Sequence, residues 1–176
     1  AAQHYMFNEP RSLVPSGGSG SMGYEVPGAM GAQVGAPDRV VWSVAGDGGF
    51  QMTMAELATM VENKIPVKFA IINNSFLGMV RQWQEFFYER RYAATPLLSP
   101  DFAKLADAYG LRSATVSHRP DVVPTIEMAR AAPGTVVIDF KVEQEDTVYP
   151  MVPAGADLQS MIRRPSPSPI VETADD

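Results

Sequence analysis

The 176-residue sequence contains no cysteine, which excludes disulfide bonds and thiolate metal sites and leaves the redox compartment open. It also lacks a long apolar run and a basic N-terminal segment followed by an apolar one, so it predicts neither a membrane-spanning helix nor a signal peptide. Positive charge is scarce: 14 Lys and Arg residues stand against 20 Asp and Glu residues, and the net charge is −6. The surface therefore offers no basic patch for nucleic acid or an anionic membrane, and we expect a soluble, cytoplasmic protein with neither partner.

Apolar residues make up 45% of the chain, close to the globular average, and the length fits one domain with a sizeable core. We expect this domain to span residues 1–153, and we expect a partly disordered tail at 154–176 because it is rich in proline and acidic residues. The chain does not begin with methionine, and residues 1–7 are typical of an amphipathic helix already under way. The expectation is therefore a domain that is truncated at its N-terminus.

Short apolar runs alternate with amphipathic segments along the chain. The runs at 39–45, 67–72, 115–116 and 135–142 predict buried strands, and the segments at 24–34, 53–63, 76–88, 99–110 and 120–132 predict helices. Strands that alternate with helices through short loops form a parallel sheet covered on both faces. The sequence therefore predicts a three-layer α/β/α domain with a mostly parallel, doubly wound sheet. Its strands are expected to carry Trp42, Val44, Val67, Phe69, Ile71, Val137 and Ile138.

Local signals place the ends of several of these elements. Residues 15–23 are rich in Gly and Ser and are typical of a loop, and Pro27 fits the first turn of the helix that follows. Thr53 and Glu56 have the spacing of a capping box. Ser99 is expected to cap a later helix, with Pro100 at the first helical position.

Polar residues stand where two of the predicted strands end. Gly46-Asp47-Gly48-Gly49 is expected to form a loop after the strand at 39–45, and Asn73-Asn74 follows the strand at 67–72. Ligands of parallel sheets bind outside the carboxyl ends of the strands, so we expect both segments to share a site. A carboxylate, an amide oxygen and a main-chain carbonyl suit Mg²⁺, and the glycines let phosphate oxygens approach the backbone. Taken alone, each segment also fits an ordinary turn.

The two segments together resemble the motif of the thiamin-diphosphate-binding fold, with the first Gly and the second Asn 28 positions apart. The neighbouring sequence is similar to acetolactate synthases, most specifically Gly78-Met79-Val80-Arg81-Gln82-Trp83 and also Phe50-Gln51-Met52. The resemblance extends over about residues 1–153. It departs from the family pattern at Glu25, where relatives usually carry a small residue. A carboxylate there either changes the charge near the cofactor or points to solvent.

The resemblance assigns roles to individual residues. It implies that Mg²⁺ is bound by Asp47, Asn74 and the main chain of Phe76, and that Gly20 and Met22 lie along the aminopyrimidine ring. The implied substrate channel is lined by Met79, Val80 and Trp83. The implied contacts with thiamin diphosphate come from Gly20, Met22, Gly46, Asp47, Gly48, Gly49, Asn74, Phe76, Leu77, Gly78 and Met79. By composition and spacing alone, the Gly/Ser segment also fits a flexible linker and the aromatic stripe an ordinary helix core.

The implied reaction is the carboligation of pyruvate with a second 2-keto acid, pyruvate or 2-ketobutyrate, in the biosynthesis of isoleucine and valine. The cofactor supplies the electron sink. The activating glutamate, and most of the FAD site of the full-length enzyme, normally lie in other domains, so no catalytic residue is expected in this chain. Expected partners are a second catalytic subunit, in a homodimer or tetramer, and a regulatory small subunit whose existence the sequence leaves open. Two alternatives remain: another thiamin-diphosphate-dependent decarboxylase or carboligase, and a non-catalytic diphosphate-binding module.

Overall fold

A computed structural model of the chain describes residues 3–165. The chain divides into two compact units, Ala1–Glu145 and Asp146–Asp176, and the first contains the sheet. The domain boundary expected after residue 153 stays a prediction. Within the described part of the chain, no helix combines the length and the apolar character needed to cross a membrane.

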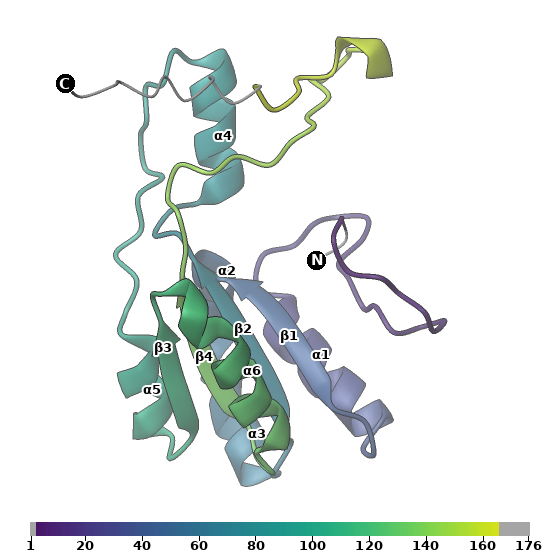
Figure 1. Cartoon of the computed structure of the whole chain (residues 1–176), viewed down its shortest axis with the longest axis vertical. Coiled ribbons are helices and arrows are strands. Elements are labelled where there is room, and N and C mark those ends of the chain that lie inside the picture. Colours follow the sequence, from purple (N-terminus) through teal and green to yellow (C-terminus); the bar gives the residue numbers. More distant parts are fainter. Residues whose placement is uncertain (1–2, 166–176) are drawn as a thin grey trace, which may run out of the picture. The chain divides into compact units, whose positions relative to one another are not determined.

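The first unit is built on a four-stranded sheet (Figure 1). Its strands are β1 (Val41–Gly46), β2 (Val67–Asn73), β3 (Arg112–Val116) and β4 (Val136–Lys141), in the order β1-β2-β4-β3. All three strand pairs are parallel, which confirms the sheet predicted from the buried apolar runs. Both faces of the central strands β2 and β4 are buried, as expected when helices cover a parallel sheet from both sides.

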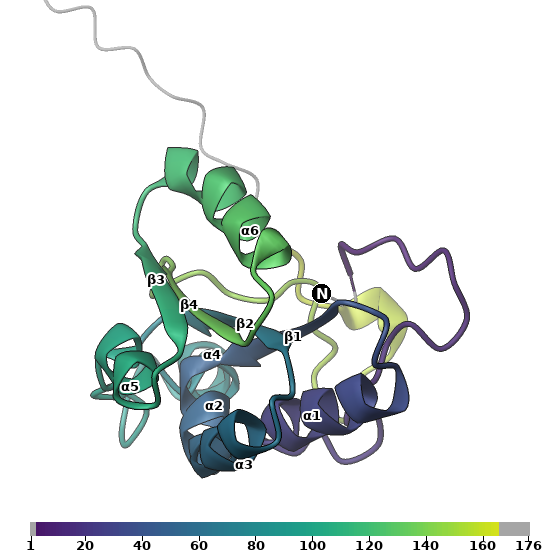
Figure 2. The same cartoon turned by 90° about the horizontal axis from the view of Figure 1, so that it is seen from below.

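Helices cover the two faces unequally. Figure 2 shows α1 (Glu25–Gly35), α2 (Asp47–Thr53), α3 (Leu57–Glu62) and α5 (Phe102–Ala108) on one face and α6 (Val122–Ala131) on the other. Short 3-10 turns, Met54–Glu56 and Arg119–Asp121, precede α3 and α6. The remaining helix, α4 (Gly78–Phe87), lies beyond the carboxyl ends of the strands (Figure 1). The predicted three-layer α/β/α architecture is confirmed.

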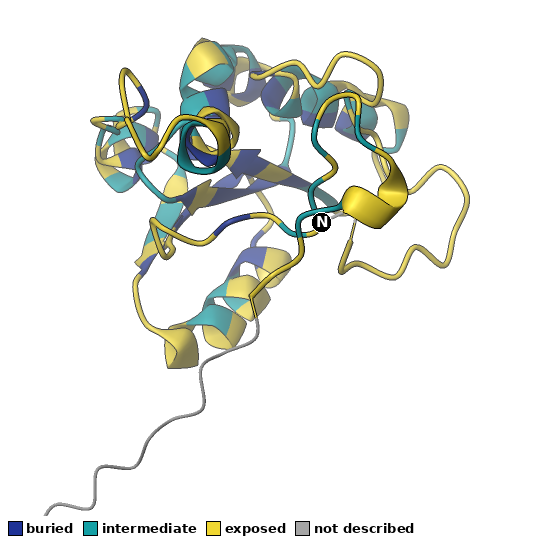
Figure 3. Ribbon diagram, turned by 90° about the horizontal axis from the view of Figure 1, so that it is seen from above, coloured by how far each residue is buried: buried dark blue, intermediate teal, exposed yellow. Residues whose placement is uncertain are grey.

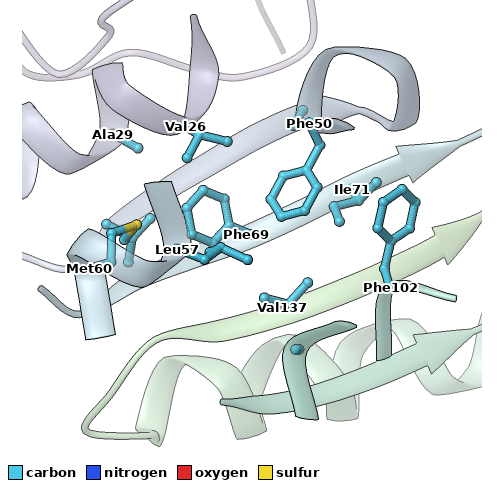
Figure 4. Packing of buried hydrophobic residues seen from close by; sticks show 12 residues of the cluster. Val26, Ala29, Phe50, Leu57, Met60, Phe69, Ile71, Phe102 and Val137 are labelled. Atoms are coloured by element: carbon cyan, nitrogen blue, oxygen red, sulfur yellow. The ribbon is translucent and has the colours of Figure 1, made fainter. Parts of the chain in front are cut away.

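The larger core lies between the sheet and the four helices on the first face (Figure 4). Phe50 of α2 is fully buried and meets the rings of Phe69 and Phe102 edge-on, with ring centroids 5.4 and 5.5 Å away. This is a favourable geometry for aromatic side chains. The smaller core, under α6, consists of Ala70, Val116, Ala129, Ala132, Val136, Ile138 and Phe140. Figure 3 shows the burial concentrated along the strands.

The helix expected at residues 1–7 is wrong for the residues that the structure describes. From Gln3 to Gly23 the chain forms turns and irregular backbone, and Tyr5 and Met6 are largely exposed. A helix this short is not stable in water without packing, and these side chains have no core to pack against. Residues 1–2 lie outside the described part of the chain.

Two predicted helix caps are also wrong. Thr53 makes no capping bond, because its hydroxyl donates to the main-chain oxygen of Gly23 at 2.8 Å. Ser99 does not cap α5, which begins two residues later than expected. Its cap is Asp101, whose carboxylate accepts hydrogen bonds from the N–H groups of Ala103 and Lys104. Asp is as good a cap as Ser, and the sequence offered both within three positions.

The second unit is small, and its described part, residues 146–165, closes on itself. Met151 and Ile162 form an antiparallel bridge on either side of a 3-10 turn, Leu158–Ser160. Arg164 pairs with Asp146 at 2.9 Å and stacks over the ring of Tyr149. The expected disordered tail, residues 154–176, falls partly outside the described residues, which end at residue 165.

Candidate functional site

The carboxyl ends of β1 and β2 bring the two sequence motifs to one edge of the sheet. Gly46 is the last residue of β1 and lies opposite Ile72 of β2 in the parallel register. Asp47 and Asn73 are therefore the next residues at this edge, and Asn74 follows directly. Neighbouring strands are about 4.8 Å apart, so a side chain from each strand can reach a common ligand.

The glycine-rich segment after β1 is helical, and the expected loop at 46–49 is wrong. Gly46 is extended and ends the strand, and α2 begins at Asp47. Glycine has low helix propensity, but Phe50 fixes this turn by inserting into the core. The first N–H groups of any helix have no partner within the helix. The N–H groups of Asp47, Gly48 and Gly49 thus have no partner within α2 itself.

The carboxylate of Asp47 is buried, with only 1% of the residue exposed. One of its oxygens, Oδ2, accepts a hydrogen bond from the hydroxyl of Ser99 at 2.8 Å. No basic side chain within residues 3–165 forms an ion pair with it. A buried carboxylate without a cationic partner is costly, so this position fits a bound cation.

The turn after β2 is held in one conformation by side-chain hydrogen bonds. Asn73 Oδ1 accepts hydrogen bonds from the N–H and the hydroxyl of Ser75, and Asn74 Oδ1 accepts from the N–H of Phe76 at 3.1 Å. Ser75 is left-handed, with φ of 59°. A Cβ atom at Gly78 would lie 3.2 Å from Asn74 Nδ2, so glycine lets the next helix begin close to this amide. Asn74 and the main chain of Phe76 thus lie in one turn, at the sheet edge where β1 also ends.

These groups form an all-oxygen donor set: one carboxylate, one amide oxygen and one main-chain carbonyl. Such a set suits Mg²⁺, which binds few protein ligands and keeps positions for water or phosphate oxygens. No cluster of three or more His, Cys, Asp or Glu side chains occurs in the described part of the chain. A transition-metal site of that kind is therefore absent from these residues, and the residues present fit Mg²⁺.

Gly48 brings three predicted cofactor contacts together. A Cβ atom here would lie 3.1 Å from Leu77 and 3.2 Å from Met22, and 2.9 Å from Leu97. The Gly/Ser segment, the first turn of α2 and the start of α4 therefore converge on one glycine. Sequence reasoning predicted Met22, Gly48 and Leu77 but missed Leu97, because no motif marks it.

The structure also describes Gly20 and Glu25, two other residues that the resemblance singled out. Gly20 has φ of 59° and donates its N–H to Ser16, so the Gly/Ser segment contains a defined turn. Glu25 is the first residue of α1, and its carboxylate packs directly against Gly49 of α2. Of the two roles left open for Glu25, the structure favours a position beside the first turn of α2 over one in solvent.

The predicted channel residues lie on the exposed side of α4. Met79 is 58% exposed and Trp83 38%, and Val80 is also exposed. Trp83 contacts Phe87, with ring centroids 5.0 Å apart, whereas Arg81 and Gln82 form the buried side of the helix. Met79, Val80 and Trp83 are therefore not ordinary helix core. They remain available for contact with a ligand or with another part of the protein.

The chain is similar to known proteins over most of its length. Residues 1–140 match the family described as "Thiamine pyrophosphate enzyme, C-terminal TPP binding domain". The chain is 48% identical over 162 residues to the acetolactate synthase large subunit of Corynebacterium glutamicum, covering 89% of this chain and 26% of that protein. It is 50% identical over 161 residues to acetolactate synthase of Mycobacterium bovis, covering 88% of this chain and 26% of that protein. It is 41% identical over 162 residues to the mitochondrial acetolactate synthase catalytic subunit of Saccharomyces cerevisiae. That match covers 92% of this chain and 24% of the yeast protein.

A solved structure is also similar. It is the thiamine diphosphate-dependent 4-hydroxybenzoylformate decarboxylase of Rhodococcus jostii RHA1, with a TM-score of 0.68 and 29% identity, covering 73% of this chain and 24% of that one. The chain thus spans about a quarter of the length of the curated relatives it matches.

Proposed function

The chain belongs to the family of C-terminal thiamine pyrophosphate (thiamin diphosphate)-binding domains, and on this premise we propose that it is the cofactor-binding domain of an acetolactate synthase. The observation that carries the proposal is the buried carboxylate of Asp47, which forms no ion pair with a basic side chain of residues 3–165 and lies at the same sheet edge as Asn74. The sequence identity of 41–50% to acetolactate synthases supports an acetolactate synthase over other enzymes of the family.

In this proposal Asp47, Asn74 and the main chain of Phe76 hold Mg²⁺, and the diphosphate binds through the metal. A Cβ atom at Gly46 would meet no other group, so phosphate oxygens can approach the backbone at the start of α2 from this side, whereas other side chains cover Gly48 and Gly49. When bound, thiamin diphosphate supplies the electron sink for decarboxylation and carboligation. The protein orients the cofactor and balances its charge.

The other end of the cofactor is assigned to the Gly/Ser segment and α4. Gly20 would accept a hydrogen bond from the aminopyrimidine through its carbonyl, and Met22 and Leu77 would support the rings from the apolar contact over Gly48. Met79, Val80 and Trp83, on the exposed side of α4, would line the channel through which the 2-keto acids enter. We propose pyruvate as donor and pyruvate or 2-ketobutyrate as acceptor.

The chain holds only part of the active site in this proposal. A glutamate that activates the cofactor, and most of an FAD site, would come from other domains, and the active form would be a homodimer or tetramer of catalytic subunits in the cytoplasm. A regulatory small subunit is a further candidate partner. Two hollows on the described surface, of which the larger is about 310 Å³, do not include Asp47 or Asn74 among their lining residues.

A product assay on the full-length protein tests the proposal. We expect 2-acetolactate from pyruvate alone and 2-aceto-2-hydroxybutyrate when 2-ketobutyrate is added, and no product from the isolated chain. The second candidate is a decarboxylase, which the similarity to 4-hydroxybenzoylformate decarboxylase favours. Release of carbon dioxide and an aldehyde from 4-hydroxybenzoylformate, without carboligation of pyruvate, would establish that alternative. Absence of both activities in a protein that binds the cofactor would indicate a non-catalytic module.

A further inference from the structure

The segment of residues 95–99, between α4 and α5, pairs with the turn that carries Asn74 and Phe76. Pro96 and Phe76 form an isolated antiparallel bridge. On either side of it, the N–H of Leu77 donates to the main-chain oxygen of Thr95, and the N–H of Leu97 donates to that of Ser75, both at 2.8 Å. The segment thus adds a short strand to one half of the candidate metal site.

The same segment also reaches the other half of the site. The hydroxyl of Ser99 donates to Oδ2 of Asp47 at 2.8 Å, across 52 positions of sequence. Gln51, one turn along α2, donates from Nε2 to the Ser99 hydroxyl at 3.4 Å and to the main-chain oxygen of Asp47 at 3.3 Å. The side chain of Leu97 closes over Gly48. Residues 95–99 therefore contact both halves of the metal site.

The beginning of the segment is fixed by α4. Thr95 is fully buried, and its hydroxyl donates to Oε1 of Gln84 at 3.3 Å. The same oxygen accepts from the N–H of Ala93, and Nε2 of Gln84 donates to the carbonyl of Ala93 at 3.0 Å. A rigid helix therefore holds the end of the segment that lies opposite Ser99.

The hydroxyl of Ser99 suits the orientation of a metal-binding carboxylate. A hydrogen bond to a charged oxygen is stronger than one between neutral groups, so it selects one orientation of the Asp47 side chain. Ser99 carries no charge and therefore does not replace the cation, and it occupies one carboxylate oxygen while leaving the other for the metal. Outer groups of this kind commonly set the affinity of a metal site.

We propose that Ser99 is a positioning residue of the metal site. Its hydroxyl fixes the carboxylate of Asp47, and residues 95–97 hold the Asn74–Phe76 turn at the distance from Asp47 that one ion requires. The inference rests on the proposed function, since it assumes that Asp47 and Asn74 bind Mg²⁺.

The test is a titration of the full-length protein with Mn²⁺ in the presence of thiamin diphosphate, with free Mn²⁺ measured by electron paramagnetic resonance. Ser99→Ala should weaken Mn²⁺ binding by about tenfold, the lower end of the range for outer groups of metal sites. Ser99→Thr keeps the hydroxyl and should restore the affinity. Ser113→Ala is the matched control, because it removes a hydroxyl bonded to Ala103, outside the site.

Two further variants separate the possible outcomes. Asp47→Asn should weaken the binding far more than Ser99→Ala does; if it does not, or if the wild-type full-length protein binds no Mn²⁺, the proposed metal site itself is wrong. If Asp47→Asn weakens binding while Ser99→Ala matches the wild type, only the role of Ser99 is overturned. A purely structural role would lower the thermal midpoint of Ser99→Ala without changing the affinity of the folded protein at low temperature. Should Ser99→Ala fail to fold, Gln51→Ala must weaken binding for the proposal to stand.

Discussion

Replacing Asp47 with Asn should change the stability of the domain in opposite directions with and without the cofactor. The carboxylate is buried and forms no ion pair with any basic side chain that the structure describes, so in the metal-free protein it is a charge held away from water. Asn has nearly the same shape, carries no charge, and keeps an oxygen that can accept the hydrogen bond from Ser99. The variant should therefore fold at least as well as the wild type in chelator, and it should bind the metal much more weakly.

The size of each effect follows from the contacts. An unpaired buried carboxylate costs several kcal/mol, and its hydrogen bond with the neutral Ser99 offsets about 1.5–3 kcal/mol of that cost. The metal-free variant should thus gain about 1–2 kcal/mol in free energy of unfolding. With Mg²⁺ and thiamin diphosphate at about 100 times their dissociation constant, binding adds about 2.7 kcal/mol to the wild type alone. The wild type should then be more stable than Asp47→Asn, which reverses their order without the cofactor.

Urea denaturation in chelator and in saturating Mg²⁺ and thiamin diphosphate measures both effects on the same protein. The matched control is Asp38→Asn, which removes an exposed carboxylate and should leave both curves unchanged. The reasoning fails if Asp47→Asn is clearly less stable than the wild type in chelator, because the carboxylate is then paired in the apo protein. It also fails if the cofactor stabilises the variant as much as the wild type.

Three further predictions concern the core, a buried lysine and α4. Phe50→Ala should lower the free energy of unfolding by about 3–5 kcal/mol, measured by urea denaturation, because the ring fills the space between Phe69 and Phe102. Burial, and secondly the charge of Arg112, lower the pKa of Lys68 below its usual value of 10.5. At pH values between the folded pKa and 10.5, the unfolded chain therefore binds more protons than the folded protein does. The free energy of unfolding of the wild type should therefore rise with pH across that window relative to that of Lys68→Met. If denaturation curves at several alkaline pH values give a difference between the two proteins that does not change with pH, this prediction is wrong. Trp83→Ala should change the ratio of acetolactate to acetohydroxybutyrate formed by the full-length enzyme, yet cost only about 1 kcal/mol of stability because the side chain is partly exposed.

Much of the fold could be predicted because its strands are continuous apolar runs. Residues 67–72 are almost entirely apolar, a pattern that a strand buried on both faces requires, and the structure buries all of them except Ile72. The order of the strands could not be read from the sequence. It depends on which apolar faces fit together, and β4 lies between β2 and β3 although it comes last.

The candidate site was predictable where it is local in sequence and not where it depends on long-range contacts. Asp47 and Asn74 each directly follow a strand, so the rule for parallel sheets was enough to place them at one edge. Ser99 and Leu97 reach this site only through the tertiary path of the chain, and the local signal at Ser99 pointed instead to a helix cap. Glycine content wrongly favoured a loop at 46–49, because propensity cannot account for the burial of Phe50 that holds this turn helical.

The position of Glu25 bears on how the cofactor can enter the site. Its carboxylate packs against Gly49, two residues along α2 from the buried carboxylate of Asp47, in a chain whose net charge is already negative. Free diphosphate would add further negative charge beside two carboxylates, which Coulomb repulsion in a partly buried site opposes. A divalent cation reverses that balance, since it is attracted by both carboxylates and by the phosphate oxygens. Metal and diphosphate should therefore bind together, and the geometry around Asp47 should control the affinity for both.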